Sequence, residues 1–248
     1  MKTAVISDIH GNLEALKSTL KAINDIGADS IICLGDIVGY GAQPNECCDI
    51  IREKIKEVVI GNHDAGCCDM LDSSWFNPVA IRSLDWTVET LSDENMEWLK
   101  SLPYSIKRDK MIFSHALLYK KDEFYYDDEL IPIYYSFNEM SDDCDLSFIG
   151  HSHKCNVLKA DKKNNRLCEW QNIPEIEIDD SFKYIINVGS VGQPRDKNPD
   201  ASFAVIENNS EKISVVQNRV KYDIEATAKK IIDCGLPSIL AERLFLGI

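Results

Sequence analysis

The chain has 248 residues, of which 44% are hydrophobic, and carries a formal net charge of −14 at neutral pH. This length suits one large domain with a full core, and no linker-like stretch divides residues 1–248, so we expect a single domain. The charge excludes a broad nucleic-acid surface, because such a surface requires clustered lysines and arginines.

Short apolar runs recur along the chain, and each ends at a block that contains turn residues. Continuous apolar runs bounded in this way are typical of strands that are buried on both faces of a sheet. The runs are residues 3–7, 30–34, 57–60, 111–114, 146–149 and 184–188.

Helical patterns separate the first strands. Asn12 can cap a helix that Gly27 can end, and Pro44 can begin a second helix. Strand and helix therefore alternate, which predicts an α/β sheet with parallel pairing. In such sheets, sites form at the carboxyl ends of the strands.

The pattern changes in the second half of the chain. Residues 157–220 alternate strand-like runs with polar turns, which predicts antiparallel strands on a second sheet. Helical signals occupy residues 65–103, and we expect helices within residues 223–246 to pack on the core. Residues 119–135 are acidic and aromatic. Their tyrosines could lie beside a site and stack on a base or sugar, or they could cover the surface with their rings in the core.

No feature indicates a membrane or export. The chain has no run of about 18 apolar residues, so no transmembrane helix is predicted. The first apolar run, residues 3–7, is too short for a signal peptide. Nine cysteines without a CxxC spacing fit a reduced compartment, so we expect a soluble, cytoplasmic protein with no membrane partner.

All five histidines fall in short blocks that contain the residues of metal sites. These blocks are residues 7–12, 61–64, 114–116 and 150–153, and a fifth block without histidine, residues 34–41, contains an aspartate. Imidazole and carboxylate bind borderline divalent metals. A single block of this kind is usually plain turn chemistry. Five of them at expected strand ends are not independent accidents, and together they predict a metal site.

Seven side chains in these blocks are candidate metal ligands. They exceed what one ion takes from protein, and they suit two ions about 3.5–4 Å apart, a spacing at which a bridging hydroxide can attack phosphorus. A carboxylate that stands alone, such as Asp36, can bridge two ions. Nitrogen and oxygen ligands without thiolate favour Mn²⁺, Fe²⁺/Fe³⁺, Zn²⁺ or Ni²⁺. The candidates are Asp8, His10, Asp36, Asn62, His115, His151 and His153.

The spacing of the candidates suggests how they converge. In extended backbone, residues i and i+2 point the same way. This spacing separates Asp8 from His10 and also separates the two histidines of residues 150–153. Adjacent residues point apart in extended backbone, so either Asn62 or His63 could bind metal while the other faces the substrate.

The ordered blocks DIHGN, GDIVGYG, GNHD, SHA and GHSH resemble the calcineurin-like metallophosphoesterase superfamily. Residues 41–46, 187–196 and 235–237 resemble a bacterial and archaeal branch of small phosphodiesterase-like members, so that the resemblance spans nearly the whole chain. It implies a four-layer αββα sandwich with two mixed β-sheets and a dimetal site at one edge. One ion would be held by Asp8, His10, Asp36 and His153, and the other by Asp36, Asn62, His115 and His151.

The resemblance also implies catalytic and substrate-binding roles. His63 resembles the residue that stabilises or protonates the leaving oxygen, with Asp64 orienting it. Asn62 would share with the ions the task of neutralising charge on the phosphoryl group. Arg195, in the block that reads QPRD, is a candidate for a contact with the substrate phosphate, and a structural salt bridge is the alternative.

The sequence thus predicts a metal-dependent phosphoric ester hydrolase that cleaves a phosphodiester or nucleotide-type bond by in-line attack of a metal-bridging hydroxide. One alternative is a phosphomonoesterase or protein phosphatase. However, residues 35–41 lack the arginine that protein phosphatases and symmetric dinucleotide tetraphosphatases carry in GDxxDRG. The other alternative is a non-catalytic scaffold, which would not need all seven ligands. We expect the substrate to be a small phosphoester or nucleotide-like molecule. The sequence leaves open which molecule is the physiological substrate and what the oligomeric state is.

Overall fold

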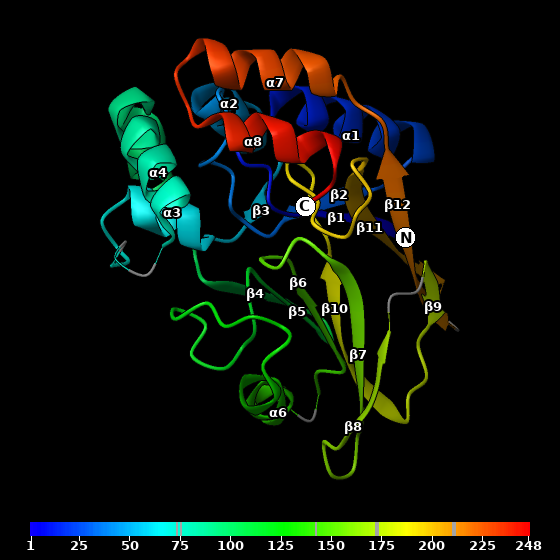
Figure 1. Cartoon of the computed structure of the whole chain (residues 1–248). Coiled ribbons are helices and arrows are strands. Elements are labelled where there is room, and N and C mark those ends of the chain that lie inside the picture. The colour runs from blue at the N-terminus through cyan, green and yellow to red at the C-terminus, as the bar shows by residue number, and fades with distance from the viewer. Residues whose placement is uncertain (73, 75, 142, 172–173, 210–211) are drawn as a thin grey trace.

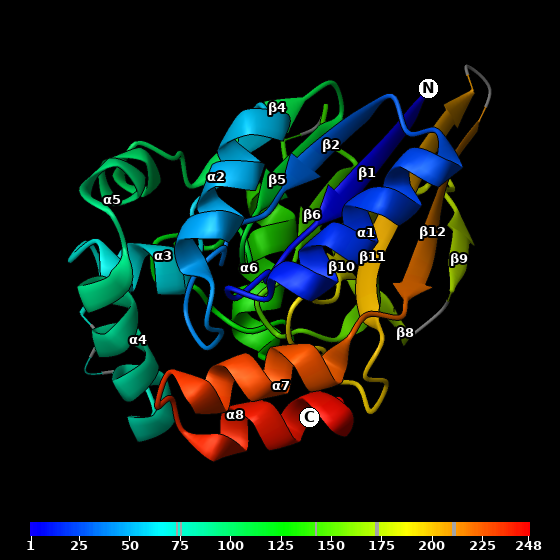
Figure 2. The same ribbon diagram turned by 90° about the horizontal axis from the view of Figure 1, so that it is seen from above.

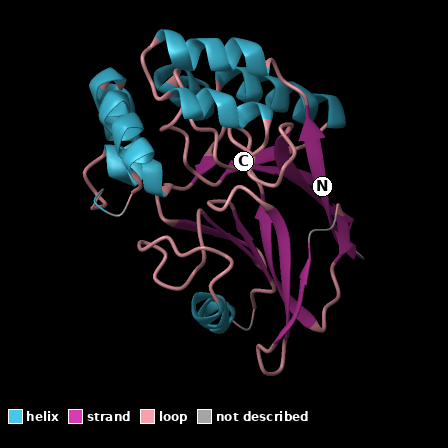
Figure 3. Cartoon of the chain, in the orientation of Figure 1, coloured by secondary structure: helices cyan, strands magenta, loops and turns pink. Residues whose placement is uncertain are grey.

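The computed structural model describes all residues except 73, 75, 142, 172–173 and 210–211. Two six-stranded sheets pack face to face, and helices cover their outer faces (Figure 1). Figure 3 shows the same layers by secondary structure, with the strands inside and the helices outside. The predicted four-layer αββα sandwich with two mixed sheets is confirmed.

The first sheet combines parallel and antiparallel pairs. In spatial order its strands are β3 (Glu57–Val58), β2 (Ser30–Cys33), β1 (Lys2–Ile6), β11 (Ala201–Asn209), β12 (Lys212–Val220) and β9 (Glu175–Glu177). β1 runs parallel to β2 and antiparallel to β11, and Val5 lies opposite Ala204 in that register. The parallel pairs β1–β2 and β2–β3 bring the loops after these three strands to one edge.

The second sheet is built in the same way. In spatial order its strands are β4 (Ser105–Arg108), β5 (Met111–Ser114), β6 (Leu146–Ile149), β10 (Phe182–Val188), β7 (Cys155–Asp161) and β8 (Leu167–Gln171). β5, β6 and β10 are mutually parallel along the sheet, whereas β7 is antiparallel to β10. The loops after β5 and β6 therefore also emerge at a common edge.

The helices cover the outer face of each sheet. Seen from above in Figure 2, α1 and α2 lie over the first sheet, and α7 and α8 lie side by side beyond the ends of its strands. α6 lies on the far side of the second sheet in Figure 1. α1 is capped by the Asn12 side chain and ends at Gly27 in the left-handed region, as the sequence predicts. The helices are α1 (Leu13–Ile26), α2 (Pro44–Lys54), α3 (Asn62–Cys67), α4 (Pro78–Thr90), α5 (Asp93–Lys100), α6 (Leu130–Glu139), α7 (Ile224–Asp233), α8 (Ser238–Glu242) and the 3₁₀ turn η2 (Arg243–Phe245).

Apolar side chains fill the spaces between the layers. Between the two sheets, Phe113 and Phe148 stack with their ring centroids 5.2 Å apart, and Ile186 is fully buried beside them. α7 is tied to the amino end of α1, because the Thr227 hydroxyl bonds the Asn12 side chain. None of the described helices is long and apolar enough to cross a membrane.

One prediction about strand placement was wrong. We expected the strands within residues 157–220 to share the second sheet, but β11 and β12 belong to the first sheet, where β11 pairs with β1. Both faces of β11 are buried, one toward the helices and one toward the second sheet. Its sequence therefore carries no alternation that could indicate which sheet it joins.

Candidate metal centre

Five loops bring the seven candidate ligands together. Each loop follows the carboxyl end of a parallel strand, and all seven side chains are buried. β1 is followed by Asp8 and His10, β2 by Asp36, β3 by Asn62, β5 by His115, and β6 by His151 and His153. Loops from both sheets therefore contribute to one cluster.

Four of these side chains form a compact group, in which every pair of ligand atoms lies within 4.8 Å. The Nε2 atoms of His10 and His153 are 3.0 Å apart, and His153 Nε2 lies 3.2 Å from Asp8 Oδ1. His10 Nε2 is 3.6 Å from Asp36 Oδ2. The donor set fits a divalent ion, because imidazole nitrogens and carboxylate oxygens converge on one point.

The tautomers of these histidines follow from their second nitrogen. His10 Nδ1 lies 3.0 Å from the Val38 carbonyl oxygen, and His153 Nδ1 lies 2.6 Å from that of Gln193. A carbonyl oxygen can only accept, so Nδ1 carries the proton in both rings and Nε2 presents a lone pair. Two facing lone pairs cannot bond each other, and a cation between them would satisfy both.

A second group lies on the other side of Asp36. His115 Nδ1 donates to the Leu34 carbonyl oxygen, and its Nε2 faces Asn62 Oδ1 at 3.1 Å and Asp36 Oδ2 at 3.4 Å. The His151 ring centroid is 5.1 Å from that of His115, and His151 Nε2 is buried without a hydrogen-bond partner. Asp36 Oδ2 thus lies at similar distances from the histidines of both groups, as a bridging carboxylate requires.

The charges in the cluster suit cation binding. Burial opposes ionisation of Asp8 and Asp36, but the neighbouring histidines outweigh it and hold both pKa values well below the ordinary range. Burial lowers the pKa of His10 far below its usual value and that of His151 to about 3. Anionic carboxylates therefore face neutral rings at His10 and His151, which are the protonation states that bind metal.

Metal binding is expected to release a proton from His115. Burial disfavours its charged form, but Asp36 and Asp8 outweigh burial and raise the His115 pKa to about 9 in the metal-free protein. Below that pH the ring is protonated, and only the neutral ring can bind an ion, so metal affinity should rise with pH toward this value. Calorimetric titration near neutral pH, in buffers of different ionisation enthalpy, measures the release. Binding without any released proton would contradict the expectation.

The backbone at these ligands differs from the extended form that the spacing suggested. Asp8 and His10 have φ values of 54° and 49°, and His151 and His153 have 67° and 60°. These residues lie in the left-handed region, which costs about 1–2 kcal/mol for each non-glycine residue. The pairs converge through tight turns, so the argument from strand alternation was wrong although the pairs do come together.

The expected contact between Asp64 and His63 is also absent. Asp64 Oδ1 accepts from the backbone N–H groups of Ile37 and Val38, and its Oδ2 accepts from that of Gly61. Asn62–Cys67 is a short helix, not extended backbone, and Asp64 is occupied in joining this turn to the loop after β2. Among the described residues, His63 Nδ1 has no hydrogen-bond partner. Asp64 therefore supports the loops that carry the ligands and does not orient His63.

Packing holds the His63 ring in place. Its centroid lies 4.4 Å from Tyr40, 4.9 Å from His10 and 5.0 Å from Phe76. A Cβ at Gly39 would come within 2.5 Å of His63 Nδ1, so only glycine leaves room for the ring there. The block GDIVGYG thus supplies Gly39 and Tyr40 as the walls around His63, a role that the sequence analysis did not assign.

Gly61 controls the position of Asp36. An added Cβ would lie 2.1 Å from Asp36 Oδ1, which already accepts from the His63 backbone N–H. We expect Gly61→Ala to destabilise the protein by about 1–3 kcal/mol, as overpacking does, and to lower the number of bound ions. Gly66→Ala in the same short helix is the control, because its Cβ meets only ordinary contacts at 3.5 Å. Thermal unfolding and metal analysis compare the two, and equal behaviour would contradict the steric argument.

Arg195 lies next to the cluster. Its backbone N–H donates to the His153 carbonyl oxygen at 3.0 Å, and its Nη2 donates to Gln193 Oε1 at 2.8 Å. Among the residues that the structure describes, Arg195 forms no ion pair with a carboxylate, so the alternative of a structural salt bridge has no support. Its Nε is buried and lacks a hydrogen-bond partner.

The acidic, aromatic stretch reaches the site through Phe124 and Tyr126. The Tyr126 ring stacks on His151 with centroids 4.2 Å apart, and Tyr126 remains 44% exposed. Phe124 is buried against the same side of the cluster, whereas Tyr134 and Tyr135 on α6 are exposed. The sequence analysis left the role of this stretch open, because its aromatic residues have no clear periodicity.

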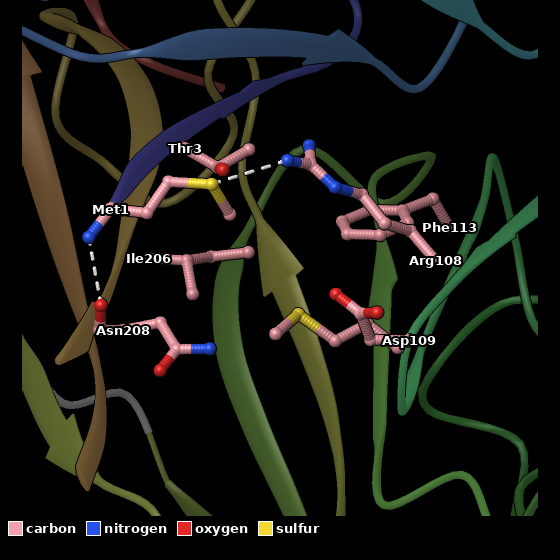
Figure 4. A pocket seen from close by; sticks show the side chains of 8 residues that line it. Met1, Thr3, Arg108, Asp109, Phe113, Ile206 and Asn208 are labelled. Atoms are coloured by element: carbon pink, nitrogen blue, oxygen red, sulfur yellow. Dashed lines mark hydrogen bonds between the residues drawn. The ribbon is translucent and has the colours of Figure 1, made fainter. Parts of the chain in front are cut away.

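A separate small cavity lies far from these residues along β1. It is lined by Met1 and Thr3 at the amino end of that strand and by Arg108 and Phe113 of the second sheet (Figure 4). Its volume of about 10 Å³ holds no more than about one water molecule.

The sandwich and its cluster of possible metal ligands define the class of metallophosphoesterases. A model of the calcineurin-like phosphoesterase superfamily domain matches residues 1–211. The chain is 42% identical over 248 residues to the uncharacterized protein MJ0912 of Methanocaldococcus jannaschii, with 98% of this chain and 97% of that protein covered. The chain belongs to the calcineurin-like phosphoesterase superfamily, as its sequence blocks predict.

Two solved structures share the fold over its full length. A metallophosphoesterase from Sphaerobacter thermophilus is 34% identical, with all of both chains covered and a TM-score of 0.83. The hypothetical protein PH1004 from Pyrococcus horikoshii is 19% identical, with 100% of this chain and 98% of that chain covered and a TM-score of 0.77. The family implies hydrolysis of a phosphoester, and the second structure supports the fold alone.

Proposed function

We propose that this protein uses two divalent ions to hydrolyse a phosphodiester or nucleotide-type bond in a small substrate. The observation that carries the proposal is the convergence of imidazole Nε2 atoms and carboxylate oxygens on both sides of Asp36. When bound, the ions supply an activated water and offset charge on the phosphoryl group. The donors favour Mn²⁺, Fe²⁺/Fe³⁺, Zn²⁺ or Ni²⁺. In this assignment one ion takes Asp8, His10, Asp36 and His153, and the other takes Asp36, Asn62, His115 and His151.

Three further side chains act on the substrate in this proposal. Asn62 directs its Oδ1 toward His115, which leaves its Nδ2 group to donate to a phosphoryl oxygen. Burial lowers the pKa of His63 to about 4, so the ring is neutral at physiological pH and keeps one N–H for the leaving oxygen. The Arg195 guanidinium, which has no carboxylate partner among the described residues, binds a phosphate group of the substrate.

The surroundings of the cluster support a diester more than a monoester. Tyr40 and Tyr126 flank it with aromatic rings, and the exposed Tyr126 ring on His151 offers a stacking surface for an ester substituent. The arginine of the GDxxDRG block that grips a terminal phosphate is replaced here by Tyr40. A phosphodiester has two ester substituents, which could contact these aromatic rings. A phosphomonoester has one substituent and would contact fewer of them.

A substrate panel tests the proposal directly. The purified protein is reconstituted separately with Mn²⁺, Fe²⁺, Zn²⁺, Ni²⁺ and Mg²⁺ and assayed on bis(4-nitrophenyl) phosphate and 4-nitrophenyl phosphate. We expect a higher kcat/KM for the diester with at least one of the first four ions. Preference for the monoester would favour the phosphomonoesterase alternative. Bound metal without turnover on either ester, or on a broader phosphoester panel, would favour a non-catalytic scaffold.

A further inference from the structure

A second arginine comes from the last turn of the described chain, close to the loop that carries Arg195. Arg243 is in η2, and the residues after η2 dock onto the loop that carries Arg195, where the Lys197 backbone N–H donates to the Gly247 carbonyl oxygen at 2.8 Å. In Figures 1 and 2 the red C-terminal end lies beside the yellow loop that joins β10 to β11. Leu244, next to Arg243, packs in one apolar cluster with Tyr40.

Tyr40 connects the two arginines to the candidate metal centre. The Arg195 Cζ atom lies 5.7 Å from the Tyr40 ring centroid, and the Tyr40 ring lies 4.7 Å from that of His10. Leu244, His10 and Tyr40 line one small cavity, which places η2 against the outer side of His10. Arg195 is therefore one side chain further out than the candidate ligands, and η2, which carries Arg243, lies on the same side of His10.

The two guanidinium groups lack acidic side-chain partners among the described residues. Within the described part of the chain, neither forms an ion pair with an aspartate or glutamate, although the protein carries a net charge of −14. The nearby Arg219, in contrast, is paired with Asp196. Arg243 uses its Nε–H on the Ile248 backbone oxygen at 2.5 Å, and the buried Nε of Arg195 has no partner.

The charges also act on each other. Burial and the positive charge of Arg195 lower the pKa of Arg243, although a guanidinium stays protonated. Two like charges at a half-buried position disfavour the folded state unless an anion binds between them. Planar guanidinium groups match phosphate oxygens in pairs, which makes phosphate the anion that this geometry suits best.

We propose that Arg195 and Arg243 form a second anion subsite, which binds a further phosphate of the substrate beside the phosphoryl group held at the metal centre. The subsite deepens the proposed function. It rests on that proposal, because the proposed function identifies the group at the metal centre as a phosphoryl group. The subsite narrows the substrate class to phosphoesters that carry a second phosphate group in addition to the one that reacts. A nucleotide ester with one further phosphate group is an example. Arg243 is then a specificity residue, since it lies beyond the atoms that react.

Equilibrium binding tests the subsite without turnover. Calorimetry measures the affinity of the Mn²⁺-loaded protein for methylphosphonate, with one anionic group, and for methylenediphosphonate, with two. We expect the second group to strengthen binding by about 10–100-fold, as hydrogen bonds between charged groups do. In Arg243→Ala this ratio should fall toward one, and Arg243→Lys should keep part of it because it keeps the charge.

Arg82→Ala is the matched control, since Arg82 is exposed on α4 and should leave the ratio unchanged. Removal of Mn²⁺ by the diphosphonate would affect every variant alike, and metal analysis after each titration measures it. A ratio that is equal in the wild type and in both Arg243 variants would overturn the subsite. The two proposals can fail separately. If the protein hydrolysed no ester, the binding ratio would still test the subsite. If the binding ratio did not change in the Arg243 variants, hydrolysis of simple diesters would still support the proposed function.

Discussion

Replacing Asp36 by asparagine is expected to remove both metal ions together and to abolish turnover. Asp36 Oδ2 lies 3.6 Å from His10 Nε2 and 3.4 Å from His115 Nε2, so it faces both groups of ligands. Changes to residues that merely orient a metal ligand already cost about 10–100-fold in affinity or activity. Loss of the bridging carboxylate should exceed this, and metal analysis together with diester turnover measures both effects.

Two variants make this test specific. Asp8→Asn should lower the metal content by one ion, because Asp8 Oδ1 is 3.2 Å from His153 Nε2 but 3.9 Å from His115 Nε2. Asp145→Asn removes a buried carboxylate at the amino end of β6, where it pairs with Lys110 and Lys162, and should leave the metal content unchanged. If Asp36→Asn kept one tightly bound ion, the bridging assignment would fail.

Local signals in the sequence were sufficient for many of the individual elements, although not for α6 or β4. Asn12 and Gly27 mark the ends of α1 because a side-chain cap and a left-handed terminus each need particular residue types. Continuous apolar runs indicated buried strands, since both faces of each sheet are covered. The ordered blocks indicated the family, and with it the two sheets, which no local pattern could have specified.

Long-range pairing and turn geometry were beyond local reasoning. β11 pairs with β1 across about two hundred residues of chain, and nothing in its apolar sequence separates that partner from a strand of the second sheet. The ligand pairs converge through left-handed turns, and the residues there are aspartate and histidine, which only the surrounding structure holds at positive φ. Asp64 was misassigned because a carboxylate beside histidine in sequence can equally well accept from backbone N–H groups.

The same limit explains why Arg243 had no sequence signal and why Tyr126 could not be singled out within residues 119–135. Each is a single residue in a segment without a motif, and each reaches the site only through packing: η2 against Tyr40, and the loop before α6 against His151. Metal ligands recur in blocks because several must converge on one ion. Residues that contact the outer part of a substrate need no such pattern, so they emerge only when the fold is known.

Replacing His63 by alanine is expected to lower kcat on an aryl phosphodiester by about 10²–10⁴-fold, the range for loss of a general acid. The metal content should stay unchanged, because His63 packs beside the candidate ligands and is assigned to neither ion. Turnover of bis(4-nitrophenyl) phosphate and metal analysis on the same preparations measure this. Equal turnover in the variant would remove His63 from the mechanism.

The response to the leaving group decides whether the His63 N–H stabilises the departing oxygen or the ring only fills space. Nitrophenolate is a stable anion and needs little help to depart, whereas phenolate needs more, so the loss in His63→Ala should be larger for a phenyl ester than for a nitrophenyl ester. Phe76→Leu is the control, since it loosens the ring that packs on the edge of His63 and leaves the imidazole in place. Added imidazole should restore part of the activity of His63→Ala by entering the space beside Tyr40. A loss of the same size for both esters, without rescue, would assign His63 to packing alone.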